Sequence, residues 1–215
     1  MAACSEWLVD KYMLTVYSSI VSVLINVVNT ILKMLLVGLI LWIKEDEKSQ
    51  QYRSIKIGVF IAQFINTGLA LLLACANFTE TNIPLLNTWV DGLYTDLHGD
   101  WYTDIGKTIV QTMLINAFMP PIEFLIGFSM KFVFNLMDRS YKKDSYLSKK
   151  KSISLYVDAY SGPQFSYHLR YASLLNTCFV TLMYGTALPL LYPIALITFV
   201  IFYVNEKLLI FYYYK

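Results

Sequence analysis

Five long apolar segments limit what this chain can fold into. They occupy residues 13–43, 57–76, 105–137, 171–188 and 189–212. A helix needs about 20 residues, within a range of about 17–25, to cross the hydrocarbon core of a bilayer. Of the 215 residues, 57% are hydrophobic and only 15% are charged, which is too apolar for a soluble domain of this length. The sequence therefore predicts an all-α, polytopic transmembrane helical bundle of about five spans in a single domain.

The last two segments follow each other without a linker. Residues 171–212 hold just enough chain for two spans, so the spans are predicted to form a tight helical hairpin. Gly185, Thr186 and Pro189 supply its turn, because glycine and proline end helices and favour turns.

The loops between the segments differ in charge, which predicts their side of the membrane. The loops at 44–56 and 138–170 carry lysines and arginines, whereas the loop at 77–104 has none and carries five aspartate or glutamate residues. Cytoplasmic loops are enriched in lysine and arginine. We therefore expect an outer N-terminus, a cytosolic C-terminus and an outer acidic loop, with the plasma membrane as the default location. Aromatic residues within 85–102 suit the membrane interface.

Polar residues recur at helical spacing inside the apolar segments. Polar side chains at membrane depth usually face the bundle interior or water, so these residues are candidates for lining a pathway or a gate. An alternative is that the amides only tie helices together, and that Lys33 extends to the cytosolic interface. The candidates with shared helix faces are Asn26, Asn29 and Lys33, then Gln63 and Asn66, then Thr112, Asn116 and Glu123, and Asn176 stands in the fourth segment.

Two adjacent prolines interrupt the third segment between its polar residues. Pro120 and Pro121 each lack a backbone donor and clash with the preceding turn. The sequence therefore predicts a kink or an unwound turn here, with carbonyls turned toward protein or a water-filled cavity. Such a bent, polar segment suits a pathway or a hinge better than an anchor.

Other classes of function find little support in the residues. Cys4, Cys75 and Cys178 form neither a disulfide framework nor a metal-ligand spacing. His98 and His168 are far apart, and no nucleophile, metal or phosphate-loop motif accompanies them. We expect no enzyme, no cofactor and no nucleic-acid partner.

Several stretches resemble one membrane-protein superfamily. "LINVVNTILKMLLVGL" and "KIGVFIAQFINTGLALLLACANF" look like the fourth and fifth spans of the anoctamin, OSCA and TMC superfamily. "FVTLMYGTALPLLYPIALITFVIFYVNEKL" looks like the hairpin of the seventh and eighth spans, and its P-L-L-Y-P spacing is closer to OSCA channels than to anoctamins. "GLYTDLHGDWYTDIGKTIVQTMLINAF" and "YSGPQFSYHLRYASLLN" are also similar to members from single-celled eukaryotes.

The resemblance implies a pore or lipid groove built from these spans. It covers spans four to eight, so the chain looks like the middle of a larger protein, and it implies a homodimer or association with missing spans. Anoctamins bind calcium through a set of carboxylates, but Leu169 and Ala172 occupy two of the matching positions. Only Glu123 and Glu206 remain as weak metal ligands, so direct calcium gating is not expected.

Three functions follow as alternatives. The first is the pore-forming core of an ion channel, with membrane tension as one gating hypothesis, in which Asp91, Asp96 and Asp100 concentrate cations at the outer mouth. The second is a phospholipid scramblase that passes lipid headgroups along the same polar groove. The third is a non-transporting membrane subunit whose amides serve packing alone. Ions and membrane lipids are the expected partners.

Overall fold

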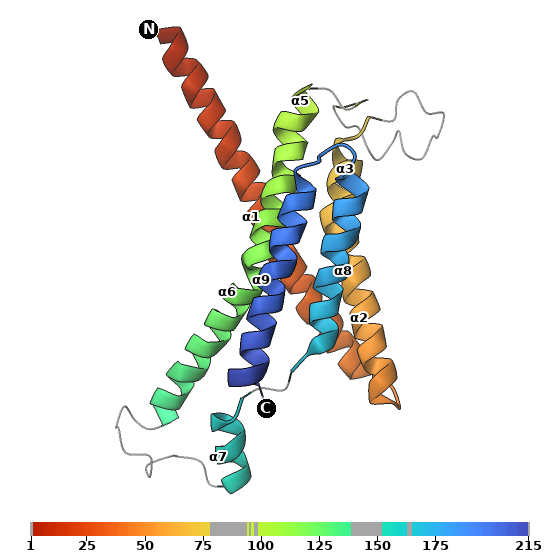
Figure 1. Cartoon of the computed structure of the whole chain (residues 1–215), viewed down its shortest axis with the longest axis vertical. Coiled ribbons are helices and arrows are strands. Elements are labelled where there is room, and N and C mark those ends of the chain that lie inside the picture. Colours follow the sequence, from red (N-terminus) through yellow and green to blue (C-terminus); the bar gives the residue numbers. More distant parts are fainter. Residues whose placement is uncertain are drawn as a thin grey trace. The chain divides into compact units, whose positions relative to one another are not determined.

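Every regular element in the described part of the chain is a helix (Figure 1). The computed structural model describes residues 2–77, 94, 96, 99–138, 152–162 and 165–214. The predicted all-α class is therefore confirmed. The elements are α1 (Ala2–Ile43), α2 (Lys48–Phe64), the π-helix η1 (Ile65–Leu69), α3 (Ala70–Cys75), α5 (Gly99–Trp101), the π-helix η2 (Tyr102–Gly106), α6 (Lys107–Asp138), α7 (Ile153–Tyr160), α8 (Tyr167–Tyr184) and α9 (Leu191–Tyr212).

Four of these helical stretches are long and apolar enough to cross a membrane, among the residues described. They are Lys11–Ile43, Lys48–Leu73, Gly99–Asp138 and Leu191–Tyr212. Large apolar side chains on their surfaces stay exposed, as lipid-facing residues do in a bilayer. These helices indicate an integral membrane protein.

The fourth expected span forms a helix of different character. Residues 171–188 overlap α8, which has 18 residues and contains His168, Arg170 and Asn176. These polar residues explain why α8 is not among the four stretches above. The turn to α9 is tight, because a side chain at Gly185 would place its Cβ 2.5 Å from the Tyr192 hydroxyl oxygen. The predicted turn glycine is thus required by the close approach of α9.

The described helices divide into two compact units. Unit 1 contains Met1–Asn116 and Tyr167–Ile197, and unit 2 contains Ala117–Ser166 and Thr198–Lys215. Two helices, α6 and α9, supply residues to both units. The division of α6 falls one turn before Pro120.

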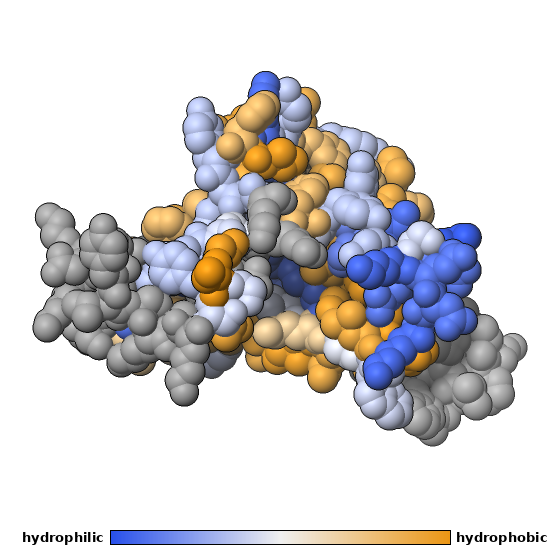
Figure 2. Space-filling model, turned by 90° about the horizontal axis from the view of Figure 1, so that it is seen from below, coloured by the Kyte–Doolittle hydropathy of each residue, from blue (hydrophilic) through white to orange (hydrophobic). Residues whose placement is uncertain are grey.

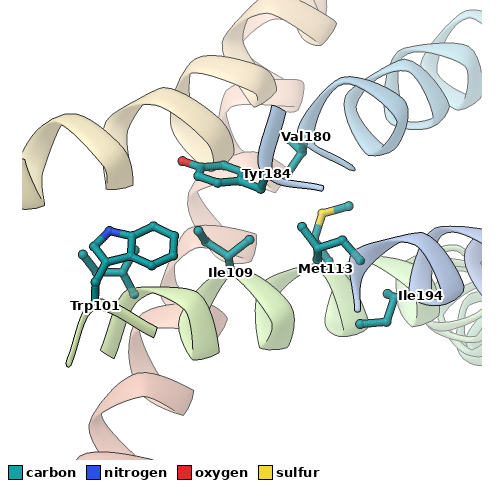
Figure 3. Close-up of a cluster of buried hydrophobic side chains, with 8 residues drawn as sticks. Trp101, Ile109, Met113, Val180, Tyr184 and Ile194 are labelled. Atoms are coloured by element: carbon teal, nitrogen blue, oxygen red, sulfur yellow. The ribbon is translucent and has the colours of Figure 1, made fainter. Parts of the chain in front are cut away.

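Unit 1 is held by packing of α8 along α2. One hydrophobic cluster, in which α2 meets α8, contains Ile55, Val59 and Ala172. A second cluster gathers side chains from α5, η2, α6, α8 and α9, and Figure 3 shows side chains of this cluster converging from separate helices. Its buried members are Trp101, Ile105, Ile109, Met113, Val180, Tyr184, Leu191 and Ile194. Between membrane helices such clusters act mainly through van der Waals contact, because lipid is as apolar as the side chains.

A short polar turn joins α1 to α2. Lys44 has φ 53°, a left-handed conformation that ends α1. Exposed charged residues follow it, including Asp46, Glu47 and Lys48. Figure 2 shows hydrophilic residues gathered at this end of the two helices. The turn therefore suits an aqueous membrane face. The predicted loop at 44–56 is too long, because its residues from Lys48 onward belong to α2.

Of the two alternatives expected in the third segment, the unwound turn is wrong, and the kink stays a prediction. α6 stays helical through Pro120 and Pro121. Each proline removes one backbone donor, so the carbonyls of Asn116 and Ala117 lose their helical partners while the flanking turns keep theirs. Membrane helices tolerate such prolines because the rest of the helix remains hydrogen-bonded.

Candidate membrane-embedded polar site

A stripe of small polar side chains on α1 enters the interior of unit 1. Ser22, Asn26 and Asn29 are all buried. The Ser22 hydroxyl lies 2.8 Å from the carbonyl oxygen of Ser18 and 3.2 Å from that of Thr108 on α6. The Asn26 amide donates to the Ser22 carbonyl oxygen at 2.8 Å. The stripe therefore faces α6 through Ser22, and through Asn29 it faces η1, the helix that follows α2.

Three side chains form a continuous hydrogen-bonded group, which we name the paired amide layer: Asn29, Asn66 and Thr67. The Asn29 Nδ2 donates to Thr67 Oγ1 at 2.8 Å, and the Asn66 Nδ2 donates to Asn29 Oδ1 at 2.9 Å. Asn66 also lies 3.2 Å from the Ile25 carbonyl oxygen. Each amide thus bridges α1 and η1. In hydrocarbon such bonds are worth about 1 kcal/mol each.

The π-helix η1 supplies Asn66 and Thr67, two of the three residues of the paired amide layer. Single turns of π-helix are rare and often occur at functional sites, because the widened turn rotates the following residues and loosens the ordinary hydrogen-bond ladder. Here the Gly68 carbonyl oxygen accepts the Tyr184 hydroxyl of α8 at 2.5 Å. Figure 3 shows the Tyr184 hydroxyl pointing away from the apolar cluster. η1 therefore joins α1, through the amides, to α8, through Tyr184.

Two further amides, Gln63 and Asn176, form what we name the open amide layer. Gln63 lies one turn beyond Val59 on α2, and Asn176 lies one turn beyond Ala172 on α8. Since Val59 and Ala172 share a cluster and α2 and α8 run in the same direction, the two amides stand at the same level of that interface. Both are buried.

The open amide layer differs from the paired one in its hydrogen bonding. The Oε1 of Gln63 and the Oδ1 of Asn176 accept no hydrogen bond from the residues described, and neither does the Oδ1 of Asn26. A buried polar atom without a partner is costly, and in native proteins it usually meets water or an ion. Amide oxygens are suitable ligands for hydrated cations. These three buried oxygens are therefore candidates for contact with water or ions inside unit 1.

The α6 face of unit 1 is also polar. Thr112 is buried, and its hydroxyl donates to the Thr108 carbonyl oxygen at 2.8 Å. Toward the start of α6, the Lys107 ammonium donates to Thr15 Oγ1 at 2.7 Å. The Gln111 amide lies 3.3 Å from Ser19 Oγ. Polar contacts between α1 and α6 thus continue toward the start of α6.

The structure separates some residues that the sequence placed on one stripe. Asn116 is the last residue of unit 1 on α6, and its buried Nδ2 has no acceptor among the described residues. Pro120, Pro121 and Glu123 belong to unit 2. Lys33 is half-buried on α1, within unit 1. The predicted stripe on the third segment is therefore shared between two units.

The two weak metal ligands both lie in unit 2. Glu123 and Glu206 are half-buried, and Asn205 Nδ2 lies 3.5 Å from Glu206 Oε1. Within the ranges described, no three or more His, Cys, Asp or Glu side chains gather where a metal ion could bind. The role of these two glutamates as metal ligands stays a prediction.

The acidic region between α3 and α5 is described only in part. Asp91 lies outside the described residues, whereas Asp96 and Asp100 are both exposed. Tyr94 forms a backbone bridge to Ala76, and its hydroxyl donates to Asp104 Oδ2 at 2.6 Å. This hydrogen bond, together with the nearby negative charge, raises the pKa of Tyr94 to about 12. Exposed carboxylates therefore gather at the start of α5, as the sequence predicts.

Some residues of the site carried no clear sequence signal. Ser22 could have been found, because it precedes Asn26 by one turn and extends the same stripe. Tyr184 and Gly68 could not, because their contact joins distant segments and depends on the π-helix. Comparisons of the chain with protein-family models, with curated proteins and with solved structures found no match. The resemblance to the anoctamin, OSCA and TMC superfamily therefore stays a prediction.

Proposed function

We propose that the chain is the pore-forming part of an ion channel of the anoctamin and OSCA type, and that ions pass the open amide layer of unit 1. The observation that carries this proposal is the set of buried amide oxygens without donors, on Asn26, Gln63 and Asn176. A bundle that needed amides only for packing gains nothing from burying unpaired oxygens at membrane depth. Water or ions in contact with them offset that cost.

The proposal also covers what opens the channel and in which membrane it works. Membrane tension is the proposed stimulus rather than direct calcium binding, since no three His, Cys, Asp or Glu side chains among the described residues gather where a metal ion could bind. The protein is proposed to work in the plasma membrane with its N-terminus outside, as a homodimer or together with further spans.

A lipid scramblase is the second candidate, and one feature of unit 1 favours it. A groove of about 490 Å³ runs along α1. Thr15 and Ser19 stand in it, and they are the acceptors for Lys107 and Gln111. Polar groups beside an apolar groove suit a headgroup that moves while its tails stay in lipid. The remaining lining residues are Tyr12, Val16, Ile20, Val23, Leu24 and Val27.

A non-transporting subunit is the third candidate. The paired amide layer favours it, because its amides are satisfied by one another and hold α1 against η1. This candidate explains Asn29 and Asn66 but leaves the open amide layer without a role.

Ion flux through the purified chain in liposomes, with and without tension, tests the proposal. Asn176→Leu is expected to reduce flux severalfold, because it removes an amide from the pathway at similar volume. Thr177→Val is the matched control, since Thr177 is the next residue of α8, is also buried and bonds within its own helix to the Ser173 carbonyl oxygen. The control is expected to leave flux unchanged.

Three other outcomes would overturn the proposal. If the inserted and folded protein passes no ions under tension, the chain does not form a pore. Equal loss of flux in both variants contradicts a pathway at the open amide layer. Lipid flipping without ion flux, measured on the same vesicles with a labelled phospholipid, favours the scramblase.

A further inference from the structure

Unit 2 contains a cavity of mixed polarity that the proposed pathway does not use. Its volume is about 300 Å³, which is at the lower end of the range for small-ligand sites. Three elements contribute to it: the second half of α6, the end of α7 with the residues after it, and the end of α9. The lining residues are Phe128, Lys131, Phe132, Asn135, Tyr160, Gly162, Tyr212 and Tyr213.

The cavity lies where two membrane-crossing helices end. α6 ends at Asp138 and α9 at Tyr212, and both are candidate spans. The α6 residues of the cavity stand about 5–15 Å before the end of their helix, at 1.5 Å per residue. Aromatic side chains are enriched at this depth, where headgroups meet hydrocarbon. A cavity at the ends of two candidate spans, with an aromatic wall, suits a lipid headgroup.

One cationic group faces this cavity. The half-buried Lys131 ammonium donates to the Ser161 carbonyl oxygen and lies 5.9 Å from the ring centre of Tyr213. In the described part of the chain, no carboxylate pairs with it. An ammonium has three donors, so Lys131 retains hydrogen-bonding capacity toward a ligand. Asp138, at the end of α6, accepts a hydrogen bond from the Tyr160 hydroxyl at 3.3 Å.

A neutral donor stands beside the ammonium. Asn135 lies one turn after Lys131 on the same face of α6, and both line the cavity. Its amide makes no hydrogen bond to other residues that the structure describes. A cation and an amide without an anionic partner are the groups that bind a phosphate. The five aromatic rings of the wall can cover the apolar part of a headgroup and attract a quaternary ammonium.

We propose that this cavity binds the phosphate of a phospholipid headgroup, with Lys131 and Asn135 as its donors. The proposal does not depend on ion conduction, since all of its residues belong to unit 2. The lipid would fix the ends of α6, α7 and α9 at the membrane surface.

Binding of water-soluble short-chain lipids to the purified full chain in detergent tests the proposal. Native mass spectrometry would compare dihexanoyl phosphatidylcholine with dihexanoylglycerol, which lacks the phosphate, and with inorganic phosphate. The phospholipid is expected to bind at least about tenfold more tightly than either of the other two. This comparison needs no variant. Equal binding of the diacylglycerol excludes a role for the phosphate, and equal binding of inorganic phosphate excludes a lipid as the required source.

Substitutions of Lys131 then test whether its ammonium donates to the phosphate. Lys131→Met, which keeps the length of the side chain, is expected to weaken phospholipid binding at least about tenfold, and Lys131→Arg is expected to retain most of it. Lys207→Met is the matched control, because Lys207 also belongs to unit 2 and lies 5.6 Å from the ring centre of Tyr203, but it does not line the cavity. Unchanged binding in a folded Lys131→Met protein, judged by its circular dichroism, overturns the assignment.

Discussion

The two units of the chain use polar groups at different places. In unit 1 the buried polar side chains lie within the helix bundle, on α1, α2, η1, α6 and α8. In unit 2 a polar cavity stands at the ends of the helices, among aromatic rings. The difference indicates two environments in one membrane protein. Polar groups deep in a bundle must bond to each other or meet an internal pathway, whereas those at helix ends meet headgroups.

The largest effect on stability is expected where two backbone segments touch in unit 2. A Cβ at Gly162 would collide with the carbonyl oxygen of Tyr213. Gly162→Ala should therefore lower the free energy of unfolding by about 1–3 kcal/mol, as overpacking does, and should weaken phospholipid binding at the cavity. Thermal unfolding and the lipid-binding assay check both effects.

The control for this change lies in the same unit. A Cβ at Gly127 on α6 would meet nothing within 4 Å. Gly127→Ala should stabilise the helix by about 0.5–1 kcal/mol. If Gly162→Ala changes the free energy of unfolding in the same way as Gly127→Ala, then Gly162 does not lie as close to the Tyr213 carbonyl oxygen as the structure shows.

The next largest effect separates the two amide layers of unit 1. Asn29→Leu removes the acceptor of one Asn66 hydrogen bond and the donor to Thr67, while Asn66 keeps the Ile25 carbonyl oxygen, so it should lower the free energy of unfolding by about 1–2 kcal/mol. Asn176→Leu removes an oxygen that has no donor, so it should be close to neutral in stability while reducing flux. Unfolding in a denaturing detergent measures both variants. Equal destabilisation would remove the distinction between the layers.

A smaller, pH-dependent effect is expected at the start of α8. The His168 ring stacks on Tyr52 of α2 with centroids 4.7 Å apart, and its buried Nδ1 has no partner among the described residues. Burial lowers the pKa of His168 from the ordinary value of 6.5. The unfolded chain therefore binds this proton at a higher pH than the folded one. As the pH falls from 6.5 through the folded pKa, the free energy of unfolding should decrease.

Thermal unfolding at several pH values between about 8 and 5, a range that brackets the ordinary pKa of histidine, measures this decrease. His168→Phe keeps an aromatic ring against Tyr52 but cannot be protonated. The variant should lose the part of the pH dependence that arises from this site. The same slope in both proteins would show that His168 does not contribute.

The smallest effect is expected at the exposed acidic end of unit 1. Replacement of Asp96 and Asp100 by asparagine should shift the reversal potential of a cation-selective current slightly, since exposed carboxylates only raise the local cation concentration. The shift should vanish at high salt, where these charges are screened. An unchanged reversal potential at low salt would remove these aspartates from the pathway.

The sequence by itself determined the helical class, the membrane setting and the buried amides of the bundle. Apolar runs of this length have few other solutions, and the spacing of Asn26 and Asn29 places both on one helix face. The turn glycine at Gly185 also followed from local chemistry. These features are local, because they depend on periodicity and on the backbone preferences of single residues.

The tertiary structure alone decided which amides are satisfied and which are open. Asn29 and Gln63 look alike in the sequence, yet one meets Thr67 across helices and the other has no donor for its oxygen. The register between α1, α2 and α8, together with the π-helix η1, makes this difference. The cavity at Lys131 likewise needs three elements that are distant in sequence. Such sites depend on packing between helices, which the pattern along one helix does not contain.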